Sequence, residues 1–365
     1  MKLSDFDYHL PPEKIAQTPA SPRDSSKLLI VDRKSGSQTD ARFSDLAAML
    51  GPNDVLVLNN TKVFPARLLV HKTSGNTQKP IELLLEKEVG VTSETISWDT
   101  LTKPGLKVGD TFEIPGSHVT GVCEEVHAYT RKVTFHINRE HFFSQLDRWA
   151  QTPIPPYIRW NSEDEIHLRT VYQTVFAKYT GAIAAPTAGL HFTPELLQRL
   201  RDRKVQIEEV TLHVGLGTFL PVKSDDITAH SMHSEWFELS AQTAYSLNEA
   251  KKAGKRIIAV GTTVVRVLES CASIEADVRS VVAKRGTTSI FIYPPYAFKF
   301  VDSIITNFHT PKSTLLMLVS AFTCSPNQRD AAFTTFQSSL IGEAYQHALK
   351  SNFRFYSFGD AMWIQ

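Results

Sequence analysis

The sequence predicts an α/β fold: a larger α/β domain with a largely parallel sheet, and a smaller inserted all-β, barrel-like domain. Two observations carry this prediction. After about residue 153, apolar strand-like runs alternate with helix-like stretches, which is typical of βαβ units. Between about residues 66 and 152, short β-like runs are separated by Gly, Pro, Ser and Asn. We therefore expect a discontinuous α/β catalytic domain, 1–65 and 153–365, interrupted by a β-barrel-like domain, 66–152.

The elements of the inserted domain follow one buried strand, expected over 55–58. Lys103-Pro104-Gly105 and Pro115-Gly116-Ser117 have the composition of turns. One helix-like stretch, 141–150, closes the region, and the proline-rich run 153–156 is the expected exit linker. The strands expected inside the inserted domain are 81–85, 95–101, 111–114, 119–126 and 133–137.

The second half of the chain carries clear helix-start signals. Thr193 is expected to cap a helix that begins at Pro194 and runs to about Lys204. Ser240 is expected to cap a helix that ends at Gly254. Further helices are expected over 262–273, 313–322 and 329–350, the last from apolar residues at three- and four-residue spacing. The strands expected between the helices are 206–214, 256–260, 289–293, 302–308 and 354–357.

Composition excludes several classes of protein. The 365 residues include 39 basic and 38 acidic side chains, so a histone-like polycation is excluded and any nucleic-acid contact must come from a local patch. Three scattered cysteines fit neither a disulfide framework nor a zinc ribbon. No apolar run approaches the roughly 18 residues of a membrane span, and the N-terminus has no signal-peptide core. We expect a cytoplasmic protein.

Small and polar residues follow five of the predicted strands, where ligands bind in open α/β sheets. The five segments are 59–62, 214–218, 261–263, 306–309 and 357–360. Gly and Asn are common where strands end, so any single segment can also be explained as an ordinary strand end that binds no ligand. The binding residues expected in these segments are Asn59, Thr61, Gly215, Gly217, Thr218, Gly261, Thr262, Thr263 and Asn307.

Two predicted helices begin at this edge, after Gly261 and at Ser313. A helix N-terminus offers unpaired N–H groups and a positive potential, so either one is a candidate site for a carboxylate or phosphate. Arg266 and Lys312 would add positive charge; plain N-capping is the alternative. No P-loop is present, and Gly215-x-Gly217 lacks the third glycine of a dinucleotide fingerprint.

Three histidines in or beside these segments are candidate general bases, because imidazole titrates near working pH. They are His191, His213 and His309. The run from His230 to Glu235 invites a zinc hypothesis, but its spacing matches no named motif, and we expect loop hydrogen bonds and no metal. The small-residue run 181–191, which contains Thr187 and Gly189, permits close approach to a flat ligand or simply tight packing.

Longer motifs point to one family. The strongest are AAPTAGLHFT (184–193), VTLHVGLGTF (210–219), VGTTVVR (260–266), ITNFH (305–309) with PKSTLLM (311–317), and GDAM (359–362). LPPEKIAQ (10–17), VFPARL (63–68) and YQTVFA (172–177) agree with them. In order and over nearly the whole chain, these runs resemble the S-adenosylmethionine:tRNA ribosyltransferase-isomerases of queuosine biosynthesis. Asn60 and Lys62 depart from the resemblance, since Asp and Arg are expected there.

The resemblance implies an enzyme that transfers and isomerises the ribosyl unit of S-adenosylmethionine onto 7-aminomethyl-7-deazaguanine at the tRNA wobble position. The products would be epoxyqueuosine-tRNA, adenine and methionine. S-adenosylmethionine would be a consumed co-substrate, with no tightly bound cofactor. The expected partner is the anticodon region of tRNA, without a membrane, and the expected state is a monomer.

The family motifs and the predicted edge together define the expected site. The catalytic candidates are the three histidines, with Glu235 and Asp360 as carboxylates for the sulfonium. Further substrate-binding candidates are Arg67, Tyr172, Gln173, Thr187, Gly189, Arg266, Lys312 and Ser313. Two other classes stay open: a different S-adenosylmethionine enzyme, such as a methyltransferase, and an RNA-binding protein without chemistry.

Overall fold

The computed structural model describes residues 1–74, 80–159, 164–215, 217, 222–275, 278–327 and 332–365. Its contacts divide the chain into two units. Unit 1 contains Met1–Lys62, Pro156–Arg159 and Thr170–Gln365, and unit 2 contains Val63–Pro155 and Trp160–Arg169. The domain boundaries expected from the sequence, and the assignment of catalysis to the larger domain, stay predictions.

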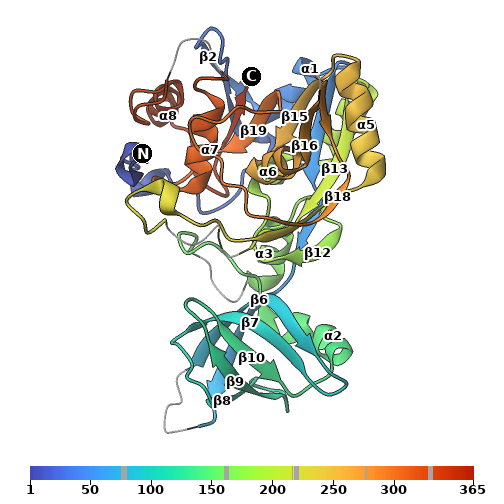
Figure 1. Ribbon diagram of the computed structural model, residues 1–365, viewed down its shortest axis with the longest axis vertical. Coiled ribbons are helices and arrows are strands. Elements are labelled where there is room, and N and C mark those ends of the chain that lie inside the picture. Colours follow the sequence, from blue (N-terminus) through green and yellow to red (C-terminus); the bar gives the residue numbers. More distant parts are fainter. Residues whose placement is uncertain (75–79, 160–163, 216, 218–221, 276–277, 328–331) are drawn as a thin grey trace. The chain divides into compact units, whose positions relative to one another are not determined.

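Unit 1 is built on a nine-stranded sheet (Figure 1). Its order is β18 (Lys284–Thr288), β14 (Glu235–Leu239), β13 (Gln206–Leu212), β3 (Asp54–Asn59), β15 (Arg256–Val260), β19 (Ser303–Asn307), β20 (Ala361–Ile364), β1 (Lys27–Val31) and β2 (Gln38–Arg42). The parallel neighbours are β13–β3, β3–β15, β15–β19 and β20–β1. The other four neighbouring pairs are antiparallel.

The sheet is therefore mixed, and the expectation of a largely parallel sheet was wrong. The central strands β13, β3, β15 and β19 are parallel, as strand–helix alternation predicts. The outer strands β14 and β18 instead pair antiparallel on one side, while β2 pairs antiparallel with β1 on the other. Strand β20 runs antiparallel to β19. Such pairings do not need a crossover helix, so the helix pattern does not reveal them.

Helices cover both faces of the central strands. Leu56, Leu58, Ile258 and Val260 belong to a core with α1 (Leu46–Met49) and α4 (Pro194–Asp202). The alternate residues of β3 and β15 are buried as completely, because successive strand side chains point to opposite faces. Helices α5 (Ala241–Lys252) and α6 (Thr262–Cys271) contact β13 and β15 (Figure 1). Central strands buried on both faces are the arrangement that α/β proteins use to place a site at the strand ends.

Unit 2 contains a closed six-stranded barrel, so the predicted all-β, barrel-like module is confirmed. The strand order is β5 (Arg67–Lys72), β6 (Pro80–Val91), β7 (Ile96–Lys103), β10 (Arg131–Phe135), β9 (Thr120–Val126) and β8 (Thr111–Glu113). β8 pairs back with β5 and closes the ring, and β11 (Ala150–Gln151) adds to β5. Helix α2 (Arg139–Trp149), capped by Asn138, follows the barrel strands (Figure 1).

Most predicted helix starts are confirmed. Thr193, Ser240 and Ser313 each accept a hydrogen bond from a first-turn N–H, at α4, α5 and α7 (Thr314–Phe322). Helix α8 (Leu340–Lys350) begins later than expected. Residues 328–331 lie outside the described part, and 332–339 are not helical. The apolar residues that predicted a helix there pack against the N-terminal segment instead: Phe333 stacks on Phe6, and Phe336 packs against Tyr8.

Two predicted strands were wrong. Residues 289–293 form no strand, and the neighbouring edge strand is β18. In 354–357 only Phe355 makes an isolated bridge, to Ile15, and the sheet strand that follows is β20. Further described elements include β4 (Thr61–Val63), β12 (Tyr179–Ala182), β16 (Ala272–Glu275), β17 (Val278–Val281), α3 (Glu165–Val171) and the 3₁₀ turn η6 (Thr187–His191). None of the described helices is long and apolar enough to cross a membrane.

Candidate functional site

The described residues of the five predicted segments lie at one edge of the sheet. Because β3, β13, β15 and β19 are parallel, their carboxyl ends share that edge. β20 runs the other way, and Ala361 at its start pairs with Asn307 at the end of β19. The segment 357–360 therefore reaches the predicted edge as the approach to β20, and not as the end of a preceding strand.

Asn59 joins two of the strand ends. Its Oδ1 accepts from the backbone N–H groups of Thr61 (3.2 Å) and Leu212 (3.0 Å), and its Nδ2 donates to the carbonyl of Leu212 (3.0 Å) and to Thr263 Oγ1 (3.3 Å). Asn59 is 1% exposed. Its amide thus fastens β3 to β13 and to the start of α6, and its polar atoms are already bonded within the protein.

The adjacent Asn60 has partners that require an amide. Its Nδ2 donates to Glu209 Oε2 at 2.9 Å, and its Oδ1 accepts from Thr211 Oγ1 at 2.7 Å. An aspartate, which the family resemblance led us to expect, would place a second carboxylate against Glu209. Asn60 therefore suits the neighbours that this chain has.

His191 sits in a closed hydrogen-bond network. Thr187 Oγ1 donates to Asn307 Oδ1 at 3.0 Å, and Asn307 Nδ2 lies 3.1 Å from His191 Nε2. Ser26 Oγ lies 2.8 Å from His191 Nδ1, and the ring stacks on Phe43. Burial, with the charges of Arg354 and Arg23, lowers the pKa of His191 to about 3. This imidazole is neutral with both nitrogens bonded.

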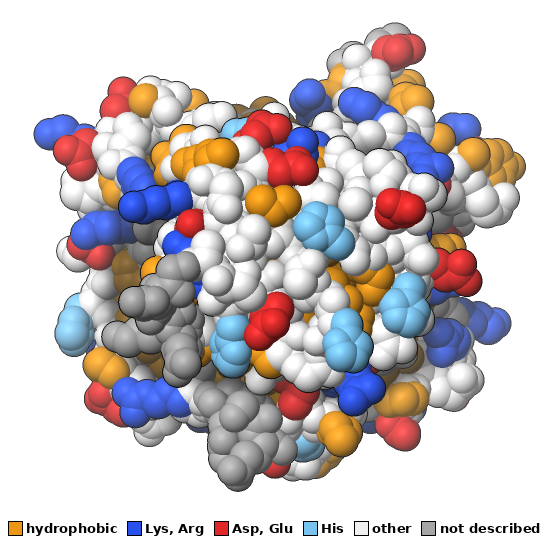
Figure 2. Space-filling model, turned by 90° about the horizontal axis from the view of Figure 1, so that it is seen from below, with side chains coloured by type: hydrophobic (Ala, Val, Ile, Leu, Met, Phe, Trp, Pro, Cys, Tyr) orange, Lys and Arg blue, Asp and Glu red, His pale blue; other side chains and the backbone are white. Residues whose placement is uncertain are grey.

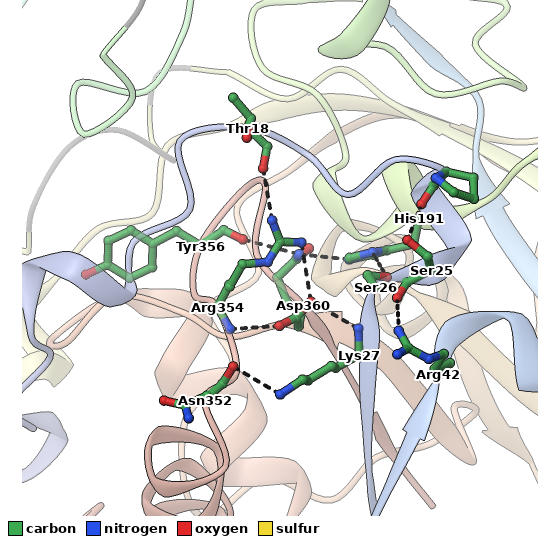
Figure 3. Close-up of polar contacts among 12 residues, drawn as sticks. Thr18, Ser25, Ser26, Lys27, Arg42, His191, Asn352, Arg354, Tyr356 and Asp360 are labelled. Atoms are coloured by element: carbon green, nitrogen blue, oxygen red, sulfur yellow. Dashed lines mark hydrogen bonds and ion pairs between the residues drawn. The ribbon is translucent and has the colours of Figure 1, made fainter.

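Asp360 is bonded to the backbone of two segments (Figure 3). Its Oδ1 accepts from the N–H of Lys27 at 3.0 Å, and its Oδ2 accepts from the N–H of Arg354 at 2.7 Å. The Arg354 guanidinium also reaches Oδ1 at 3.4 Å and donates to the Thr18 carbonyl at 3.1 Å. Asp360 is 2% exposed, and its bonds join the start of β1 to the segment before β20.

His213 differs from His191 in its surroundings. Its Nδ1 lies 2.8 Å from Thr61 Oγ1, and its ring stacks on Trp236 with centroids 4.8 Å apart and an interplanar angle of 17°. The side chain is half-buried, and burial lowers the pKa of His213. Within the described residues, Nε2 has no hydrogen-bond partner.

His309 is buried at 8% exposure and bonded to Thr306 Oγ1 through Nε2 at 2.9 Å. Its backbone N–H donates to the Tyr345 hydroxyl, and its carbonyl accepts from the Tyr8 hydroxyl. Burial lowers the pKa of His309 to about 3. Its backbone and ring contacts fix the loop after β19.

Glu235 and Arg266 form a buried ion pair, with exposures of 6% for both residues. Glu235 also accepts from the N–H of Gly215 at 2.9 Å through Oε1. Arg266 further donates to the carbonyl of Ile290 at 3.3 Å. The pair therefore joins β14 and α6 to the loop after β13. Among the described residues, no three His, Cys, Asp or Glu side chains form a group that fits a metal ion.

The two helix N-termini differ. Ser313 Oγ accepts from the N–H of Leu316 at 3.2 Å and so caps α7. Lys312 pairs with Asp7 at 2.8 Å. At α6 the N-cap is Gly261, which has φ +91° and no capping side chain, and Thr262 and Thr263 open the helix.

The other predicted residues are distributed more widely. Gln173 O accepts from Arg23 at 2.7 Å, and buried Tyr172 packs edge-on against Phe358. A Cβ at Gly189 would lie 2.7 Å from the Phe176 ring, and one at Gly217 would lie 3.0 Å from His233. Arg67 belongs to unit 2, where it pairs with Glu82 at 2.7 Å. Thr218 lies outside the described residues.

Sequence reasoning missed Ser26 and Trp236, the partners of His191 and His213. For Trp236 the signal is weak: burial alternates along Glu235-Trp236-Phe237-Glu238-Leu239 in the structure, but apolar and polar residues do not alternate in this sequence. Ser26 gives no such signal, because it meets His191 from a distant part of the chain.

On the face drawn in Figure 2, basic and acidic side chains are interspersed, in keeping with the balanced charge.

Comparisons with known proteins cover nearly the whole chain. The model of the family described as queuosine biosynthesis protein matches residues 3–364. Proteins named S-adenosylmethionine:tRNA ribosyltransferase-isomerase are 46% identical in Desulfitobacterium hafniense, 45% in Sulfurihydrogenibium sp. and 42% in Halothermothrix orenii, each over 100% of both chains. The crystal structure of an S-adenosylmethionine tRNA ribosyltransferase from Thermotoga maritima matches with a TM-score of 0.53 and 34% identity, covering 99% of this chain and 100% of that one. This chain belongs to the queuosine biosynthesis protein family.

Proposed function

We propose that the protein is a cytoplasmic S-adenosylmethionine:tRNA ribosyltransferase-isomerase. The observation that carries this function is the full-length identity of 42–46% to relatives of that name. The enzyme moves the ribosyl unit of S-adenosylmethionine onto 7-aminomethyl-7-deazaguanine at the tRNA wobble position and isomerises it. Epoxyqueuosine-tRNA, adenine and methionine leave as products. S-adenosylmethionine is a consumed co-substrate.

His213 is the general base in this proposal. The sulfonium acidifies the adjacent ribose methylene, and a base that removes that proton opens the sugar and expels adenine. The aminomethyl nitrogen then attacks, and methionine leaves as the epoxide closes. A base needs an accessible lone pair and a pKa near working pH. Burial lowers the pKa of all three histidines, to about 3 for His191 and His309, but the half-buried His213 is the one whose Nε2 has no partner within the described residues.

The start of α6 is the proposed place for the methionine carboxylate. Its first N–H groups have no capping side chain, whereas Ser313 caps α7. Free N–H groups and the helix dipole together favour an anion. Arg266 has a structural role in this proposal and does not bind the methionine carboxylate, because its charge is paired with Glu235.

Mixing the purified protein with S-adenosylmethionine and tRNA carrying the aminomethyl-deazaguanine tests this function. Mass spectrometry should find adenine and methionine in equal amounts, both dependent on the modified tRNA, with a matching mass gain on the tRNA. S-adenosylhomocysteine in place of adenine would indicate a methyltransferase instead. Binding of tRNA without any released product would indicate an RNA-binding protein. Unmodified tRNA is the matched negative control.

A further inference from the structure

We propose that Trp236 is a positioning residue for the reaction: its indole face holds the His213 ring and stabilises the imidazolium that forms when Nε2 takes a proton. This role rests on the proposed function, because it assumes that His213 accepts the substrate proton.

Strand pairing places the two residues directly opposite each other. Leu212 of β13 pairs with Phe237 of β14, and the next residue, His213, donates its backbone N–H to the Trp236 carbonyl at 2.9 Å. Side chains of directly opposite residues on neighbouring strands lie within contact distance. The indole and imidazole rings are nearly parallel, with centroids 4.8 Å apart. A cation within about 6 Å of an aromatic face is attracted to it, most strongly when the aromatic residue is Trp.

Gly181 covers the other face of the imidazole. A Cβ added there would lie 2.6 Å from Cδ2 and Nε2 and 2.7 Å from Cε1, so the glycine backbone lies over the ring. Thr61 Oγ1 holds the Nδ1 edge at 2.8 Å. The ring is thus restrained on two faces and one edge. This leaves Nε2 as the nitrogen available to a substrate.

The charged groups on the surrounding elements do not stabilise the protonated form of His213. Glu235 at the start of β14 is paired with Arg266 of α6. On β18, the Arg285 guanidinium lies 5.4 Å from the Trp236 ring, and on the way to β12, Lys178 lies over Tyr179. Glu238 is two residues further along β14 than Trp236. Burial is the cause that lowers the pKa of His213, and no carboxylate in the described part of the chain offsets it. The indole face is therefore the group in contact with the ring that favours its protonated form.

The direct test measures the pKa of His213 by NMR titration in the full-length protein. His213→Ala identifies the resonance among the 13 histidines. With Trp236→Leu, the pKa should fall by about half a unit to one unit, since loss of the aromatic face disfavours the cation. Trp236→Phe should give a smaller fall. Trp149→Leu, in helix α2 of unit 2, is the matched control and should leave the pKa unchanged.

Activity gives the second readout. In Trp236→Leu, kcat should fall, and the acid limb of the kcat–pH profile should move to lower pH with the His213 pKa. Trp236→Phe should recover part of both effects, because a phenyl face also attracts a cation. KM values for the two substrates should change little.

An unchanged His213 pKa in folded Trp236→Leu overturns the inference, and Trp236→Phe decides the question if the leucine variant does not fold. The two proposals fail in different ways. If His213→Ala keeps full activity while the pKa still falls in Trp236→Leu, His213 is not the base, and the stabilisation of its cation by Trp236 stands.

Discussion

Asn307 fixes the tautomer of His191. Its amide oxygen accepts from Thr187, so its nitrogen faces His191 Nε2 as a donor at 3.1 Å. Because Nε2 accepts, the ring proton is on Nδ1, which donates to Ser26 Oγ at 2.8 Å. The chain of bonds joins η6, β19 and the start of β1. His191 is therefore part of the framework of the edge.

Removing the Asn307 amide should mainly affect stability. Asn307→Leu leaves the buried His191 Nε2 without a partner, which should lower the free energy of unfolding by about 1–3 kcal/mol. The half-buried Thr187 hydroxyl also loses its partner. Urea denaturation at pH 7 measures the change. A loss below about 0.5 kcal/mol would contradict the bonding pattern, since surface substitutions remain within that range.

The protein should lose stability as the pH falls below about 6.5. His191 and His309 have pKa values of about 3 in the folded state, whereas an unfolded histidine titrates near 6.5. Between these values the unfolded chain binds more protons, so stability falls as the pH falls. Each histidine contributes a slope of up to about 1.4 kcal/mol per pH unit.

Unfolding measured from pH 7 down to pH 5 checks this slope. His309→Gln should flatten it, because one of the two depressed groups is gone. A wild-type unfolding free energy that stays level across this range would refute the buried, neutral state of both rings.

His213→Ala should lower single-turnover adenine release at least ~100-fold, the usual contribution of a general base. S-adenosylmethionine binding should persist. His347→Ala is the matched control, because His347 is partly exposed and pairs with Asp40 on the surface. Near-normal turnover in His213→Ala would show that His213 is not the general base.

Gly181→Ala should impair turnover more than folding. Its new Cβ would lie 2.6 Å from the His213 ring and must displace the imidazole or the backbone. Gly286→Ala offers a control within a strand, because nothing lies within 4 Å of its added Cβ. We expect kcat to drop in the first variant and to remain unchanged in the second. Equal kcat values in the two would show that the ring has room to move.

Breaking the buried pair of Glu235 and Arg266 should be costly. Glu235→Gln keeps an acceptor for Gly215 but leaves the Arg266 charge uncompensated, which should destabilise the fold by about 3–5 kcal/mol. The double variant Glu235→Met, Arg266→Met should recover much of that loss, since no unpaired charge is then buried. Thermal melting of both variants checks the comparison; a double variant less stable than Glu235→Gln would argue against it.

The sequence predicted the elements of the fold better than their pairing. Apolar runs and capping residues identify β3, β15 and α4 because both signals are local. The direction of β14, β18 and β20 depends on distant partners, so the mixed sheet could not be predicted from helix alternation. Ala361-Met362-Trp363-Ile364 is fully buried and apolar and forms β20, whereas 354–357, predicted as the final strand, makes only an isolated bridge at Phe355.

The predicted edge was found because parallel strands end together, and β20 joins them by entering from the same side. What the sequence does not reveal is which polar groups are already bonded. Asn59, Asp360 and His191 have the residue types of a catalytic site, but their atoms bind strand ends and loops. His213 is distinguished by a half-buried ring whose Nε2 has no described partner, and both are properties of three-dimensional packing.

Strand β20 lies between β19 and β1, although it is synthesised after every other strand of the sheet. β1 and β2 therefore join the sheet only through a segment that leaves the ribosome much later. At ~5–20 residues per second, that interval is roughly fifteen seconds to a minute. During it the apolar residues of β1 have no sheet partner on their inner side. The first hairpin of this chain therefore stays without its inner neighbour until strand β20 completes the sheet.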